Sequence, residues 1–244
     1  DAAIDATSTA SSIVVAASLG KSTAFSGGGA TAVNKIAGKS NAYISGGDVR
    51  ATGATGDISV TADNSSHIDA HVKAIAVAVA AGAENTPAAA IGVSIARNLI
   101  GHDEFGETNP VEVKAYTLNA SLHADKSITL TGTSDAVIDA TVSATSVAAA
   151  LTAKDATTVS VGGVFTSNDI ATNIGAYIDG INSAGTIKSI TADGAGGIQL
   201  IATDKSKITA DSQAVSVAAA LAPAGKGISV SVGVDVALNT IANI

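Results

Sequence analysis

The densest group of metal-ligating side chains lies in residues 101–110, which read GHDEFGETNP. His102, Asp103, Glu104 and Glu107 stand close together there, between a Gly and a Pro that favour a loop. Carboxylate oxygens are the ligands that Ca²⁺ prefers, so this segment could coordinate calcium or contact a partner. A solvated surface loop would have the same composition. We therefore expect no cofactor, with structural Ca²⁺ as the open alternative.

A second candidate is the alternating triplet His67, Asp69 and His71. Alternate residues of a strand share one face, and imidazole and carboxylate groups on one face suit zinc or copper. However, four residues of extended chain separate the two histidines by about 13 Å. One ion cannot bridge that distance in a regular strand, so a solvated strand face is the favoured interpretation.

The phosphate-binding and nucleophile motifs are incomplete. Residues 20–22 and 38–40 both read GKS, the end of a phosphate-binding loop, but that loop needs a Gly where the chain has Val15 and Val33. Residues 18–21 match the SxxK pattern of serine acylases, yet the chain has neither an SDN nor a KTG element. No catalytic residue is predicted, and we do not expect an enzyme.

Composition narrows the classes of partner. The chain has 13 Lys and Arg against 21 Asp and Glu, a net charge of -8, so it lacks the basic surface that nucleic acid binding needs. The absence of Cys excludes disulfides and thiolate metal sites. An acidic chain without Cys or Met is compatible with secretion from a bacterium, and we interpret it as a piece of a longer protein.

Residues 74–96 (AIAVAVAAGAENTPAAAIGVSIA) contain a single charge and are long enough for a membrane-spanning helix. The polar residues 83–87 (AENTP) interrupt the stretch with turn-forming types. We therefore predict two separate segments joined by a polar corner, and no membrane span.

The chain repeats itself at a nearly fixed period. Isoleucines open four copies of one pattern at intervals of 64, 70 and 70 residues, and asparagines follow them after 30, 30, 30 and 31 residues. These repeat anchors are Ile4, Ile68, Ile138 and Ile208, and Asn34, Asn98, Asn168 and Asn239. The repeats run approximately over residues 1–64, 65–134, 135–204 and 205–244, the last of them partial. A period of this kind predicts a single array.

Alternation predicts strands within each copy. Residues 228–239 alternate branched aliphatics with Ser, Gly, Asp, Ala and Asn, which places the aliphatics on one face of a strand. Residues 68–80 alternate in the same way, and an Ala-rich helix is the alternative there. The far half of these first strands is expected to be covered on both faces. Small residues in one phase predict that another surface approaches closely, either a second layer or another molecule.

These features predict an all-β fold, a β-helix-like β-solenoid built from tandem repeats of about 70 residues, as a fragment of a longer array. Each copy would stack its strands on the next, so neighbouring repeats of the same chain are the first expected partners. Shorter strands are expected around Tyr43, Tyr116 and Tyr177. Whether one repeat forms one wide rung or two narrow ones stays open.

The segments AVSVAAAL (214–221), GISVSVGVDVALN (227–239) and ISVTAD (58–63) resemble the repeat modules of very large bacterial surface and secreted filamentous adhesins, of the haemagglutinin and leukotoxin kind. The resemblance implies a non-enzymatic structural or adhesive module at the cell surface or outside the cell. It would act as a rigid stalk or filament segment in attachment to a host or neighbouring cell. Two alternatives are a β-helix enzyme that modifies polysaccharide, and a lattice- or ice-binding surface. The flat Ser, Thr and Ala phases suggest the second, but the row Ser229, Ser231, Gly233, Asp235 lacks the regularity of a Thr ladder.

Overall fold

The computed structural model describes residues 2–180 and 188–244, and every helix or strand element in these ranges is a β-strand. The all-β class is as predicted. The Ala-rich segments are strands, since β6 covers His67–Gly82 and β7 covers Thr86–Ile100. The stretch 74–96 is thus divided at its polar corner, and no helix that could span a bilayer occurs in the described ranges.

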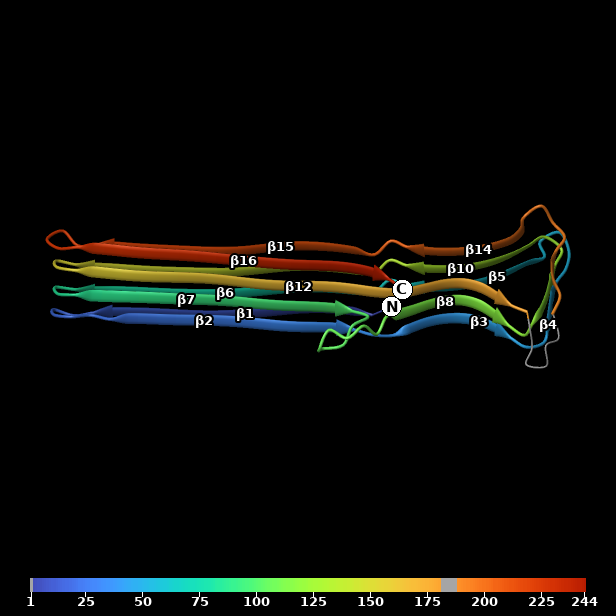
Figure 1. Ribbon diagram of the computed structural model, residues 1–244, viewed down its shortest axis with the longest axis horizontal. Helices are drawn as coiled ribbons and strands as arrows, with labels where there is room; N and C mark the ends of the chain where they lie inside the picture. The colour runs from blue at the N-terminus through green and yellow to red at the C-terminus, as the bar shows by residue number, and fades with distance from the viewer. Residues whose placement is uncertain (1, 181–187) are drawn as a thin grey trace.

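Two sheets of long parallel strands form the elongated part of the molecule, on the left of Figure 1. The first sheet has the order β1-β6-β11-β15, with β1 (Ala3–Ala17), β11 (Val137–Thr152) and β15 (Lys207–Leu221) beside β6. The second contains β2 (Ala24–Ile36), β7, β12 (Ala156–Asp179) and β16 (Gly227–Asn243), in this order. We call the part in which the two sheets face each other the arm.

Shorter strands form the opposite end of the molecule, which we call the short-strand end (Figure 1). Here β3 (Lys39–Ser45) pairs with β8 (Val111–Leu118), and β8 pairs with the last part of β12. Two further sheets have three strands each. They contain β4 (Asp48–Ala51), β9 (Ser121–Ala124) and β13 (Ile190–Ala192), and β5 (Asp57–Asn64), β10 (Ser127–Ser134) and β14 (Gly197–Asp204).

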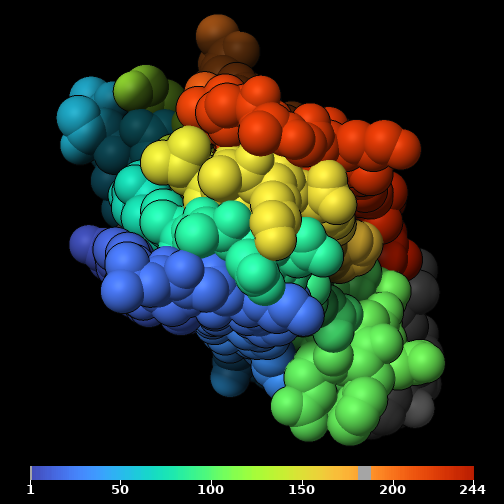
Figure 2. Space-filling model, turned by 90° about the vertical axis from the view of Figure 1, so that its left-hand side faces the viewer, coloured from blue at the N-terminus to red at the C-terminus, as the bar shows by residue number. Residues whose placement is uncertain are grey.

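The strand register follows the period of the sequence. Ile4 lies opposite Ile68, Ile68 opposite Ile138, and Ile138 opposite Ile208, all in parallel pairs. The strands from β1 to β5 pair in the same way with those from β6 to β10. Each sheet is therefore built in levels, where one level consists of the strands that one repeat contributes. The levels follow one another in chain order from blue to red in Figures 1 and 2.

The asparagine anchors connect the four levels of the second sheet. Asn34 Nδ2 donates to Asn98 Oδ1 at 2.8 Å, and Asn168 Nδ2 donates to Asn239 Oδ1 at 2.8 Å. Asn98 and Asn168 are fully buried and are also bonded to each other. A column of amides, which we call the asparagine ladder, thus crosses the sheet at right angles to its strands.

The two sheets of the arm pack through small side chains, mainly a cluster of buried alanines. One glycine of each level faces the opposite sheet. These register partners are Gly28, Gly92, Gly162 and Gly233. A Cβ on Gly28 would lie 2.5 Å from the backbone oxygen of Ile75, and one on Gly162 would lie 2.9 Å from that of Val215. The surface that approaches the small-residue face is therefore the opposite sheet of the same chain.

The short-strand end has a core of larger side chains, including the fully buried Ile128 and Leu130. On the sheet of β3, β8 and β12, Tyr43, Tyr116 and Tyr177 are register partners. Their rings stack with centroids 5.2 Å and 5.0 Å apart and interplanar angles of 12° and 5°. The three tyrosines therefore occupy equivalent positions in three successive levels.

One expectation about the arm is wrong. The sequence predicts that the far half of the first long strands is covered on both faces, but Val15 is 70% exposed and Val217 is 48% exposed. The alanine phase of these strands, not the valine phase, faces the second sheet. The close approach at the glycine column leaves no room there for a branched side chain, whereas Val72, Val142 and Val164 are buried elsewhere between the sheets.

Candidate metal centre

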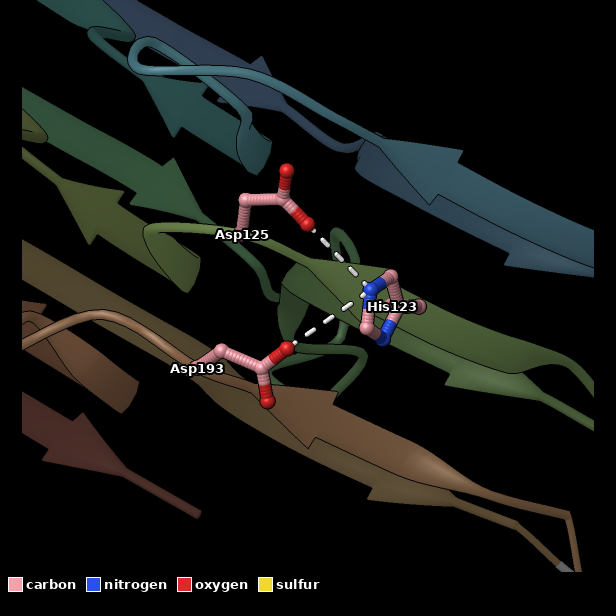
Figure 3. Close-up of side chains that lie close together, drawn as sticks. All are labelled: His123, Asp125 and Asp193. Atoms are coloured by element: carbon pink, nitrogen blue, oxygen red, sulfur yellow. Dashed lines mark ion pairs between the residues drawn. The ribbon is translucent and has the colours of Figure 1, made fainter.

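Three ligating side chains converge beside the sheet of β4, β9 and β13 (Figure 3). His123 lies in β9, Asp125 follows β9, and Asp193 follows β13. Their ligand atoms all lie within 4.8 Å of one another, and within residues 2–180 and 188–244 no other group of three His, Cys, Asp or Glu residues meets that geometry. We call these residues the His123 cluster.

The parallel register explains why these groups meet. Ala124 and Ala192 are Cα partners, so the residues that follow them leave the sheet one level apart. Asp193 continues the pairing, because its N–H donates to Ala124 O at 3.0 Å. Two carboxylates at adjacent levels repel each other, and His123 Nε2 lies between them, 3.3 Å from Asp125 Oδ1 and 3.7 Å from Asp193 Oδ2.

The cluster can hold a positive charge in two ways. A protonated His123 supplies that charge itself and pairs with both carboxylates. A neutral His123 supplies one nitrogen ligand beside two carboxylate oxygens, a set that zinc and related divalent metals accept with further positions for water. Gly53 N donates to Asp125 Oδ2 at 2.7 Å, which orients that carboxylate and leaves Oδ1 toward the histidine.

A shallow hollow of about 210 Å³ adjoins the cluster on the same sheet face. His123 lines it together with Arg50, its register partner on β4, and with Asp48 and Thr191. The face thus brings a guanidinium, an imidazole and carboxylates to one open surface. Such a set can bind an anionic or hydroxyl-rich group as well as a metal ion.

The candidate calcium ligands of the sequence lie elsewhere and do not converge. They are His102, Asp103, Glu104 and Glu107, in the segment that projects from the levels between β7 and β8 (Figure 2, light green). Asp103 Oδ1 accepts the backbone N–H groups of Phe105 at 2.9 Å and Glu107 at 2.8 Å. This carboxylate therefore closes the turn of the loop, and no three of the four candidates form a ligand group.

The triplet His67, Asp69 and His71 lies along the first half of β6, as expected. Asp69 Oδ1 is 3.2 Å from His71 Nε2, and both side chains are open to solvent. His67 does not join them in a ligand group. The triplet is thus a solvated strand face with one His–Asp contact.

Two carboxylates link neighbouring levels and have lowered pKa values. A hydrogen bond from Lys39, followed by one from Asn41, lowers the pKa of Glu112. The side chains of Ser127 and then Lys126 lower the pKa of Asp57 in the same way. Both interactions join residues that are about one repeat apart, so these exposed carboxylates contribute to the contact between levels.

Sequence reasoning missed the His123 cluster because its members are far apart in the chain. The signal was present in the repeat: HAD at residues 123–125 aligns with TAD at 191–193. Stacking the two copies would have placed Asp125 over Asp193 with the histidine beside them.

Searches against protein-family models, curated proteins and solved structures found no significant match to the chain. The class of the protein therefore follows from its own architecture, an all-β chain of parallel sheets built in register-matched levels.

Proposed function

We propose that the chain is a segment of a β-solenoid, in which each repeat of about 70 residues forms one wide rung, and that it serves as a structural and adhesive module of a large extracellular bacterial surface protein. The observation that carries the proposal is the register. Equivalent residues are Cα partners over all four levels, from Ile4 to Ile208. A repeat protein of this kind gains stability from contacts between neighbours and can be extended indefinitely, as a stalk requires.

The interactions across the levels suit a load-bearing role. The asparagine ladder, the tyrosine stack and the pair of Lys39 with Glu112 all connect one level to the next. In such a stack, each added repeat lengthens the molecule along one axis and adds one set of backbone hydrogen bonds. The chemistry of the exposed loop 101–110 and of the His123 cluster offers individual features for contact with a host or neighbouring cell.

The experiment that tests the proposal is insertion of extra copies of residues 65–134 between the second and third repeats. Four added copies should lengthen the stack by about 19 Å, since parallel strands lie about 4.8 Å apart. Solution scattering measures that increase, and thermal unfolding should shift upward with copy number. Separately folded or unfolded inserts would refute the solenoid. Attachment is tested by measuring whether the purified chain blocks adhesion of the source bacterium to cells.

One observation favours a second function, modification of an acidic polysaccharide. Arg50, His123 and the carboxylate of Asp48 line one hollow on one sheet face, which is the kind of arrangement that a β-helix lyase uses. Release of unsaturated products from a polyuronide by the native chain, but not by the His123→Ala variant, would support this function over a purely structural one.

We do not propose a lattice- or ice-binding function. The row Ser229, Ser231, Gly233 and Asp235 lies on the inward phase of β16: a Cβ on Gly233 would lie 3.2 Å from the oxygen of Ala214 in the opposite sheet. A lattice-binding surface requires the outward phase, which is composed of branched aliphatic side chains on this strand.

A further inference from the structure

The outer surface of the second arm sheet is mostly apolar, and its polar members level with residues 228–238 are Thr31, Arg97, Thr157 and Ser167. On β16 the outward side chains are Ile228, Val230, Val232, Val234, Val236 and Leu238. We call this row, with its register partners on β12, β7 and β2, the valine face. Across the sheet, for example, Val232 continues as Val161, Ile91 and Gly27.

The valine face is exposed along its whole length. Val234 is 52% exposed, Ile91 51% and Phe25 66%, although they belong to three different levels. The exposure is therefore a property of the sheet and not only of its last strand. The one charged residue within the face is Arg97, which lies at the end of the face nearer the short-strand end. The guanidinium of Arg97 donates to Glu104 O at 2.9 Å in the projecting loop.

The size of the face decides what it requires. Residues 228–238 span about 36 Å, and four strands span about 19 Å, so the face has an area of about 700 Å². That exceeds the roughly 300–600 Å² of the largest apolar patch on an ordinary monomer. Burial of such a face releases water from Val and Ile side chains, and its exposure has a continuous cost in free energy.

We propose that two copies of this chain pack valine face against valine face. The paired faces would bury about 1,400 Å², within the range of about 1,200–2,000 Å² for stable protein–protein interfaces. A twofold contact brings each patch against itself, and the single charge of this patch, Arg97, lies at one end of it and is bonded to the projecting loop, so the middle of the face meets no electrostatic conflict in that arrangement. The result is a sandwich in which the valine faces are about 10 Å apart and form a core between the two copies.

The composition of the face favours a second copy over a lipid surface. Peripheral membrane surfaces use Trp or Tyr at the interface and Lys or Arg toward the headgroups. The chain has no Trp, and its three tyrosines lie at the short-strand end, outside the arm. Branched aliphatics on a flat sheet are instead the composition of a sheet-to-sheet core.

This association differs from the stacking of levels. Stacking uses the open strand edges of β1, β2, β15 and β16, whereas the valine face uses side chains that point out of the sheet. Face-to-face pairing closes at two copies, while edge pairing continues without limit. The inference does not depend on the proposed function, and the two can fail separately.

The test is sedimentation equilibrium of the full chain over a wide range of protein concentration. We expect a monomer–dimer equilibrium for the native chain, and a monomer for the variant Val93→Lys, Val161→Lys, whose new charges lie in the middle of the face. The matched control Thr141→Lys, Ser143→Lys changes outward positions of β11 on the other sheet and should dimerise like the native chain. Circular dichroism checks that all three keep their strand content.

Three outcomes would overturn the proposal. They are a native chain that stays monomeric at the highest concentration, a dimer that persists in the Val93→Lys, Val161→Lys variant, and growth to open-ended oligomers through the strand edges. Flotation with neutral phosphatidylcholine vesicles is a further test, in which a monomer that binds the vesicles through Val93 and Val161 would assign the face to lipid instead. A Val161→Thr variant preserves shape and should weaken the dimer without unfolding the arm.

Discussion

Asn98 Nδ2 donates to Asn168 Oδ1 at 2.7 Å, and both side chains are completely buried although the residues are 70 positions apart in the chain. Each of the two amides donates to one neighbouring level and accepts from the other. Only identical residues in identical register can continue such a column. The ladder therefore couples the period of the sequence to the stacking of the fold.

Replacement of Asn98 by Ala should destabilise the chain by about 2–4 kcal/mol, because it leaves Asn34 Nδ2 and Asn168 Oδ1 without their partners. The control is Asn239→Ala at the exposed end of the ladder, which removes one hydrogen bond and should cost about 1 kcal/mol. Chemical denaturation of both variants measures the difference. Equal losses would show that the ladder has no special role in the interior.

The close approach of the two arm sheets makes a prediction at neighbouring glycines. Gly162→Ala should destabilise the protein by about 1–3 kcal/mol, since its Cβ would meet the oxygen of Val215 at 2.9 Å and the backbone must shift. The adjacent Gly163→Ala is the matched control, because its Cβ points outward and meets only Val93 Cγ2 at 3.9 Å. Thermal unfolding of the pair should therefore separate them, and a similar melting temperature for both would contradict the packing of the arm.

Acid should weaken the contact between levels. Hydrogen bonds lower the pKa of Glu112 and of Asp57 below the ordinary values of 4.5 and 3.8. A lowered folded-state pKa means that the stabilisation is complete above the ordinary value and is lost as the pH falls through the lowered one. The melting temperature should thus fall as the pH drops below about 4.5, in the window set by these two groups.

The variant Glu112→Gln isolates one of these groups. At neutral pH it should melt below the native chain, and the difference should shrink as acid protonates Glu112 in the native protein. Glu104→Gln in the projecting loop provides the control for loss of one negative charge. A constant difference between Glu112→Gln and the native chain at every pH would argue against the ion pair with Lys39 as its cause.

The repeat in the sequence predicted which strands pair, but not which face of each strand is buried. Ile68, Asn98 and Tyr116 recur at the spacing of the strand register, so alignment of the copies with one another predicts which residues pair. The outward direction of Val232 could not be predicted, because alternation defines two faces without saying which one is buried. Here the close approach at Gly162 settles it, and that distance depends on the path of the chain around the whole level. The same dependence hid the contact of His123 with Asp193.

The His123 cluster predicts a response to divalent metal that the loop 101–110 does not share. Zn²⁺ should bind where His123, Asp125 and Asp193 converge and should raise the melting temperature, because the ligands come from two levels that unfolding separates. At a free concentration of 100 times the dissociation constant the stabilisation would be about 2.7 kcal/mol. Calorimetric titration measures the dissociation constant for Zn²⁺, and thermal unfolding with added Zn²⁺ measures the stabilisation.

The variants His123→Ala and Asp193→Asn should abolish the rise in melting temperature, whereas Asp103→Asn, in the loop, should preserve it. A shift that survives the first two variants would place the ion elsewhere, and the absence of any shift would refute a zinc site at the His123 cluster.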